Sequence, residues 1–148
     1  MNPPARKTRV LFVCIGNMCR SPMAEGFARV WGDGFVEAYS AGTHPTGVVS
    51  EASIEMMAEI AIDISAQRSK GLEQVPLEWM DVIVSMAPRP AAKMAPPEFR
   101  GRALDWRIDD PLGGPSGTFR RVRDEIGSRV RELLDEIRLT APSSPDRL

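Results

Sequence analysis

One short stretch, Val10–Pro22, constrains the fold of this chain more than any other. It opens with Val-Leu-Phe-Val, an apolar and mostly β-branched or aromatic run, which predicts a strand buried on both faces. Gly16 and Asn17 then predict a tight turn, because both residues tolerate unusual backbone angles. Ser21 is a candidate helix N-cap, and Pro22 suits the first helical position. We therefore expect a strand, a tight loop and the start of a helix.

This junction predicts an anion site. Backbone N–H groups converge where a helix starts, and the helix dipole favours negative charge there. Cys14 stands at the strand end of the loop and Arg20 at its helix end, so a thiol and a guanidinium face one bound anion. These groups should stabilise Cys14 as a thiolate and bind a tetrahedral oxyanion, with Arg20 gripping two of its oxygens. The candidate phosphate-binding residues are Cys14, Ile15, Gly16, Asn17, Met18, Cys19 and Arg20.

The two residues beside the turn have supporting parts in this hypothesis. Asn17 is expected to adopt left-handed angles while its side-chain amide braces the loop. Ser21 is expected to cap the helix, to donate a hydrogen bond to the Cys14 sulfur, or to do both. Donation to the sulfur would help Cys14 to act as a leaving group later in a reaction.

Short apolar strands that alternate with helices predict an α/β fold for the rest of the chain. The expected strands are 10–13, 35–39, 82–84 and 103–106, and the expected helices are 22–31, 50–61, a short one within 86–97, and 118–138. The length of 148 residues predicts a single domain, with flexible ends at 1–7 and 140–148. Ligands of a parallel sheet bind at the carboxyl ends of its strands, where Cys14 is expected.

The last predicted helix, 118–138, is amphipathic, with an apolar face and several arginines among acidic residues. Spacing predicts three i,i+4 ion pairs on it, namely Arg120–Asp124, Arg121–Glu125 and Arg131–Asp135. Because acids interleave with the arginines, we interpret this face as solvated and not as a surface for nucleic acid.

Composition excludes several classes of function. The net charge of −1 gives no general attraction to nucleic acid or to an anionic membrane. No apolar run approaches the roughly 20 residues that a membrane span needs, and no secretory signal is evident. With two cysteines and one histidine, His44, neither a disulfide framework nor a structural zinc site is expected. A reactive thiol in a reducing cytoplasm fits this composition.

The stretch Val13–Glu25, which reads VCIGNMCRSPMAE, resembles the motif of low-molecular-weight protein tyrosine phosphatases and of their relatives, the arsenate reductases. Further matches follow in family order at Ser40–Thr43, Ile62–Ser65, Asp81–Val84 and Asp110-Pro111. The resemblance covers nearly the whole chain. It implies a three-layer fold with a four-stranded parallel sheet flanked by helices, and a reaction that uses no metal and no cofactor.

The resemblance also implies roles for particular residues. Cys14 would attack phosphorus and form a cysteinyl-phosphate. Asp110, which precedes a proline, matches the residue that protonates the leaving group and then activates water, and Asp109 is the alternative acid. Cys19 matches a second cysteine that pairs with the nucleophile under oxidation, although a thiol that only packs within the loop is an equal interpretation.

Three departures from the family pattern bear on the substrate. Leu112 and Thr46 stand where aromatic residues often wall a slot for a phenyl ring. Gln67 replaces a histidine that commonly braces the loop asparagine. The segment 85–96 contains no cysteine, which excludes the three-cysteine relay of thioredoxin-linked reductases.

Three functions remain open from the sequence. The leading hypothesis is a phosphomonoester hydrolase of the low-molecular-weight tyrosine phosphatase type, acting on a phosphotyrosine protein or a small aryl phosphate. The alternative is an arsenate reductase that uses Cys14 and an external thiol such as glutathione or mycothiol. The third is a non-catalytic oxyanion-binding module, which the intact set of Cys14, Arg20, Ser21 and Asp110 argues against. We expect a monomer or a weak dimer.

Overall fold

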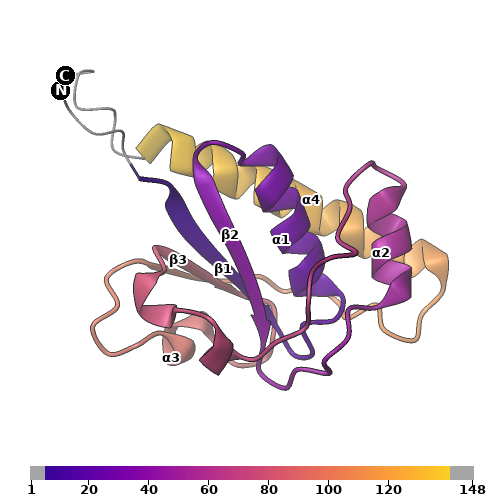
Figure 1. Cartoon of the computed structure of the whole chain (residues 1–148), viewed down its shortest axis with the longest axis horizontal. Coiled ribbons are helices and arrows are strands. Elements are labelled where there is room, and N and C mark those ends of the chain that lie inside the picture. Colours follow the sequence, from indigo (N-terminus) through magenta and orange to yellow (C-terminus); the bar gives the residue numbers. More distant parts are fainter. Residues whose placement is uncertain (1–5, 141–148) are drawn as a thin grey trace.

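The computed structural model describes residues 6–140. Figure 1 shows a central sheet between layers of helix. The strands are β1 (Thr8–Cys14), β2 (Val36–Gly42), β3 (Val82–Ser85) and β4 (Arg102–Asp105). The α-helices are α1 (Arg20–Trp31), α2 (Glu51–Ala58), α3 (Ala91–Met94) and α4 (Ser116–Thr140), and two short 3₁₀ helices are η1 (Leu72–Gln74) and η2 (Leu77–Trp79).

The sheet is parallel throughout, in the order β2-β1-β3-β4. The apolar run of β1 lies at its centre with no exposed surface, as the sequence predicted. Val10 and Phe12 pack with α1, α2 and α4 on one face, while Leu11 and Val13 pack with the η1–α3 region on the other. The predicted three-layer α/β fold is therefore confirmed.

Several predicted boundaries need correction. Helix α1 begins at Arg20 with Cys19 as its N-cap residue, so the prediction that Ser21 caps the helix is wrong. Ser50 caps α2, accepting a hydrogen bond from the Ser53 N–H at 3.3 Å. That helix ends at Ala58 and not at Ala61, which has a left-handed φ of 63°. β2 runs on to Gly42 because it pairs with β1 over the full length of that strand.

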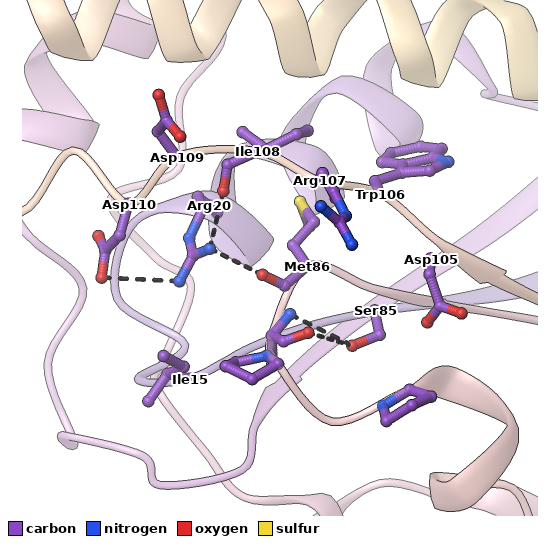
Figure 2. Close-up of a pocket in the computed structure, with 13 residues that line it drawn as sticks. Ile15, Arg20, Ser85, Met86, Asp105, Trp106, Arg107, Ile108, Asp109 and Asp110 are labelled. Atoms are coloured by element: carbon purple, nitrogen blue, oxygen red, sulfur yellow. Dashed lines mark hydrogen bonds and ion pairs between the residues drawn. The ribbon is translucent and has the colours of Figure 1, made fainter.

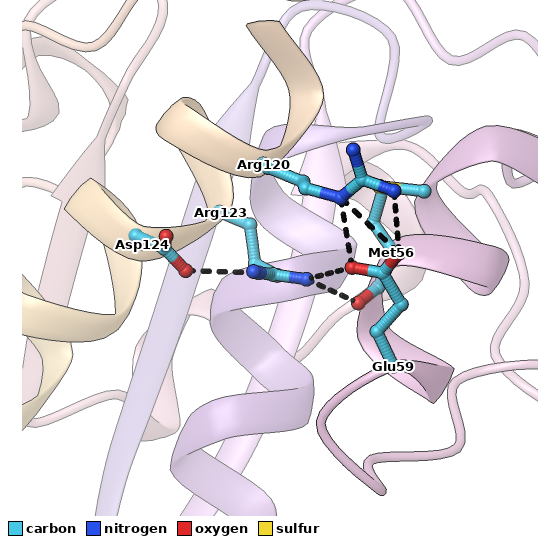
Figure 3. Close-up of polar contacts among 5 residues, drawn as sticks. All are labelled: Met56, Glu59, Arg120, Arg123 and Asp124. Atoms are coloured by element: carbon cyan, nitrogen blue, oxygen red, sulfur yellow. Dashed lines mark hydrogen bonds and ion pairs between the residues drawn. The ribbon is translucent and has the colours of Figure 1, made fainter. Parts of the chain in front are cut away.

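The arginines of α4 do not form the three predicted i,i+4 pairs. Arg120 pairs with Glu59 at the end of α2, with the closest atoms 2.7 Å apart (Figure 3). Arg121 approaches Asp109 at 3.5 Å, and Arg131 stacks over the Trp31 ring at 4.3 Å. An i,i+4 pair contributes only a few tenths of a kcal/mol, so partners on neighbouring elements displace it readily. The buried face of α4 is confirmed, since its predicted apolar residues are all buried.

Glu59 links α2 to α4 through two arginines (Figure 3). Its carboxylate accepts from Arg120 and from Arg123 Nη1 at 2.7 Å, and the buried Arg123 also donates to the Met56 carbonyl at 2.8 Å. Hydrogen bonds from Arg120 and Arg123 lower the pKa of Glu59 from 4.5 to about 2. The ionised form of Glu59 therefore favours the folded state.

This contact predicts a pH dependence of stability. Because the folded pKa of Glu59 is depressed, its contribution is complete above pH 4.5 and is lost as pH falls toward 2. We expect Glu59→Gln to lower the melting temperature at pH 7 and to flatten its decline between these pH values. Thermal melts across pH measure this, with exposed Glu98→Gln as the matched control. If the melting temperature of Glu59→Gln falls with pH as steeply as that of wild type, other carboxylates are responsible for the acid sensitivity.

The described chain reaches close to both predicted flexible ends. Arg6 donates to the Asp81 carboxylate at 2.7 and 2.8 Å, and Thr140 is the last residue of α4. Residues 1–5 and 141–148, where most of the predicted flexibility falls, lie outside the described residues. Within residues 6–140, no helix has the length and apolar character that crossing a membrane requires.

Candidate active site

In the loop between β1 and α1, most carbonyl groups accept hydrogen bonds while the amides remain available. The carbonyls of Cys14, Ile15, Gly16 and Met18 accept hydrogen bonds from the segment that follows β2, at 2.7 to 3.1 Å. Among residues 6–140, no acceptor is found for the N–H groups of residues 15–19. These N–H groups are therefore available to donate hydrogen bonds to a bound anion.

Cys14 is buried at the end of β1 and touches a short chain of polar groups. Its Sγ lies 3.0 Å from the Ser21 hydroxyl, which accepts a hydrogen bond from Asn17 Nδ2 at 2.8 Å. The Ala41 carbonyl is a more distant partner for the same hydroxyl, at 3.4 Å. Because Asn17 occupies a lone pair of that oxygen, the hydroxyl proton is free to point at the sulfur. The geometry suits the predicted donation from Ser21 to a Cys14 thiolate.

Asn17 braces the loop as predicted, though with a different partner. It is fully buried with a left-handed φ of 49°, and its Oδ1 accepts from the Lys70 N–H at 2.9 Å. Gln67 does not contact Asn17; it donates to the Pro22 carbonyl at 2.9 Å and accepts from Arg29 at 2.6 Å. The prediction that Gln67 replaces a bracing histidine is therefore wrong, because a backbone amide already occupies that acceptor.

The segment that carries Lys70 is a part of the site that sequence reasoning missed. Ser69 Oγ donates to the Gly16 carbonyl at 2.9 Å, and the Lys70 carbonyl accepts from the Gly42 N–H at 2.8 Å. A Cβ at Gly42 would lie 2.6 Å from the Ile15 carbonyl oxygen, so only glycine lets β2 end this close to the loop. The Ser-Ala-Gly-Thr motif was the available signal for this packing.

Arg20 is buried and held by two backbone carbonyls. Its Nη1 donates to the Met86 carbonyl at 2.7 Å and to the Ile108 carbonyl at 2.9 Å (Figure 2). Its Nη2 lies 3.6 Å from a carboxylate oxygen of Asp110. With Nη1 committed to these carbonyls, Nε and Nη2 form the edge that can grip an oxyanion in two places. The loops after β3 and β4 thus orient the guanidinium.

Two neighbouring aspartates were candidates for the general acid, and the structure separates them. Asp110 lines the cavity above Cys14, and its Oδ1 accepts from the Leu112 N–H at 3.1 Å. Asp109 turns toward α4, where it approaches Arg121, and its side chain is 77% exposed. Of the two, only Asp110 lies where it can exchange a proton with a group bound above the sulfur.

A small cavity of about 120 Å³ opens directly above Cys14. Among the described residues no Phe, Tyr or Trp lines it, although the imidazole of His44 does, and Thr46 and Leu112 stand on its wall as the sequence predicted. Cys19 also reaches this cavity, and burial raises the pKa of its thiol above the usual value. Cys14 and Cys19 are both free thiols in this structure. The cavity therefore has room for a compact tetrahedral oxyanion beside the Cys14 sulfur.

A cysteine and an arginine at the two ends of an amide-lined loop, on a four-stranded parallel sheet, define the superfamily of low-molecular-weight tyrosine phosphatases and arsenate reductases. The family model described as "Low molecular weight phosphotyrosine protein phosphatase" matches residues 9–142. The chain belongs to this family.

Relatives and solved structures point to both branches. The chain is 38% identical over 136 residues to a "Glutaredoxin arsenate reductase" of Synechocystis sp., covering 87% of this chain and 98% of the relative. A structure titled "An arsenate reductase in the phosphate binding state" is 35% identical with a TM-score of 0.77, covering 88% of this chain and 98% of the other. A low molecular weight protein tyrosine phosphatase from T. tengcongensis is 29% identical with a TM-score of 0.76, covering 88% and 98%.

Proposed function

We propose that this protein is an arsenate reductase that takes its electrons from a small external thiol, such as glutathione or mycothiol. The observation that carries the proposal is the cavity above Cys14, which is about 120 Å³ and is lined by no Phe, Tyr or Trp side chain of the described residues. Arsenate is a compact tetrahedral oxyanion and needs no slot for a phenyl ring. Similarity to arsenate reductases over 87% of the chain supports the same conclusion.

The reaction needs one cysteine of this chain and two external thiols. The Cys14 thiolate attacks arsenic and displaces a hydroxyl, which leaves as water after protonation, so that a sulfur–arsenic(V) bond forms. An external thiol then attacks the Cys14 sulfur. The sulfur–arsenic electron pair stays on arsenic, which leaves as arsenite, and a mixed disulfide remains on Cys14. A second external thiol reduces that disulfide, returning Cys14 and releasing the oxidised thiol.

The residues around Cys14 have parts in these steps. The loop amides and Arg20 hold the oxyanion and its developing charge. Ser21 donates to the sulfur whenever it carries negative charge, and Asp110 protonates the departing oxygen. The segment 85–96 supplies no further thiol, so in this proposal the second sulfur comes from outside the chain. A reducing cytoplasm, rich in such thiols, is the compartment we propose.

The experiment is a coupled assay with purified protein and arsenate. With glutathione, glutathione reductase and NADPH, we expect NADPH consumption that depends on arsenate and that yields arsenite. A parallel assay supplies mycothiol with its own reductase. Absence of arsenite formation with both thiols and with a glutaredoxin added would overturn the proposal.

The second candidate is a phosphatase, which was the leading hypothesis from the sequence. Asp110 favours it, because its carboxylate lies 3.6 Å from Arg20 and beside the cavity, where it can protonate a departing alcohol. Hydrolysis of an aryl phosphate by the same preparation tests this candidate. Turnover of the aryl phosphate in a protein that leaves arsenate unreduced would favour it, and phosphotyrosine peptides would then be compared with small esters.

A further inference from the structure

A second and larger cavity lies beside the one above Cys14. Its volume is about 580 Å³, and it shares Ile15, Arg20 and Asp110 with the smaller cavity. Figure 2 shows this cavity between the loop after β3 and the loop after β4. A molecule seated in it would therefore approach Cys14 past Ile15, a side chain that is 36% exposed.

The larger cavity carries charges of both signs that have no partner of opposite sign. Arg107 makes no ion pair or side-chain hydrogen bond within residues 6–140. Asp105 accepts a hydrogen bond from the Ala91 N–H at 2.8 Å but has no cationic partner in the same part of the chain. Figure 2 shows Arg107 and Asp105 on one side of the cavity, away from Asp110. Such a wall suits a zwitterion, whose carboxylate and ammonium each find an opposite charge.

The backbone beside these side chains also has hydrogen-bonding groups that lack a partner. Residues 107–109 continue beyond β4, the edge strand of the sheet, without regular structure. Within the described chain, no acceptor is found for the N–H groups of residues 107–109. Of their three carbonyl groups, only that of Ile108 accepts a hydrogen bond, which comes from Arg20. Free backbone groups next to a sheet edge bind extended peptides by adding main-chain hydrogen bonds.

We propose that this cavity is the binding site for the external reductant, and that the reductant is a small zwitterionic peptide thiol of the glutathione class. Its main chain lies along residues 107–109, its terminal carboxylate pairs with Arg107, and its ammonium faces Asp105. Its thiol reaches past Ile15 to the Cys14 sulfur. The inference rests on the proposed function, because it assigns the place of the thiol that attacks Cys14.

The chemistry at this site is the thiol step already described. The thiolate of the bound peptide forms a bond to Cys14 Sγ as the sulfur–arsenic(V) bond breaks, and the electron pair leaves with arsenite. The thiol is oxidised to one half of a mixed disulfide, and arsenic is reduced by two electrons. The second peptide thiol completes the disulfide and frees Cys14.

The test measures the KM for glutathione in the coupled arsenate assay. We expect Arg107→Ala to raise it by about 5- to 10-fold, the loss of one charge-assisted contact, with little change in kcat or in the KM for arsenate. The matched control is Arg100→Ala, an exposed arginine that lies two residues before β4 and therefore at the opposite end of the sheet. Glutathione monoethyl ester, which lacks the glycine carboxylate, should react poorly with wild type and equally poorly with Arg107→Ala. Equal KM values for glutathione in wild type, Arg107→Ala and Arg100→Ala would overturn the assignment of the site. So would a further loss of reactivity when the ester replaces glutathione in the assay of Arg107→Ala.

A binding measurement separates this inference from the proposed function. S-methylglutathione cannot react, so its calorimetric titration reports the site alone. Weaker binding to Arg107→Ala than to wild type and Arg100→Ala supports the site even in a protein that fails to reduce arsenate, and only the proposed function then falls. If arsenate is reduced but S-methylglutathione binds all three proteins equally or none of them, the function stands and the site is wrong.

Discussion

Replacing Cys14 by serine is expected to abolish arsenite formation and to cut aryl phosphate hydrolysis by at least about 10³-fold. A serine hydroxyl at the end of β1 is a far weaker nucleophile and cannot form the mixed disulfide that carries the electrons. The loop amides and Arg20 are untouched by this change, so affinity for phosphate should stay within about 3-fold of wild type. Steady-state kinetics and calorimetric titration with phosphate measure the two effects separately.

Cys19→Ser provides the contrast for this experiment. Cys19 is buried, and burial raises the pKa of its thiol, so it stays protonated and a poor nucleophile at neutral pH. We expect this variant to hydrolyse an aryl phosphate at close to the wild-type rate. If it loses arsenate reduction alone, a disulfide between Cys14 and Cys19 carries the electrons within the chain. Substantial turnover in Cys14→Ser would refute the assignment of the nucleophile.

Local sequence predicted the elements that depend on neighbours along the chain. Val10 to Val13 form the central strand, because a run of four apolar residues admits burial on both faces. The turn at Asn17 follows from a residue that tolerates left-handed backbone angles. The anion-binding loop between β1 and α1 was predictable for the same reason, since it lies within one stretch of thirteen residues, Val10–Pro22.

What the sequence did not predict depends on contacts between distant segments. Glu59 and Arg120 are 61 residues apart, and only the packing of α2 against α4 brings them together. The Lys70 amide, 53 residues from Asn17, occupies the acceptor that was assigned to Gln67. Backbone groups of this kind carry no residue-specific pattern, which is why the two carbonyls that hold Arg20 were also unforeseen.

Asp110→Asn is expected to cut turnover by about 10²- to 10⁴-fold, the range for loss of a positioned general acid. An amide at this position keeps the acceptor for the Leu112 N–H but cannot donate a proton to a leaving group. Asp109→Asn is the matched variant, because Asp109 lies one residue away and turns toward Arg121. We expect that variant to lose less than about 5-fold, an indirect effect on its neighbour.

Leaving-group chemistry decides whether Asp110 acts as an acid or only fixes Arg20. If it protonates the departing oxygen, Asp110→Asn should harm the hydrolysis of phenyl phosphate much more than that of p-nitrophenyl phosphate, whose leaving group needs little protonation. If Asp110 only orients the guanidinium at 3.6 Å, both esters should slow equally and the affinity for phosphate should fall with them. A larger effect in Asp109→Asn than in Asp110→Asn would move the acid to position 109. The comparison thus tests a side chain that both candidate functions require, since water leaving arsenate and an alcohol leaving phosphate each need a proton at the same place.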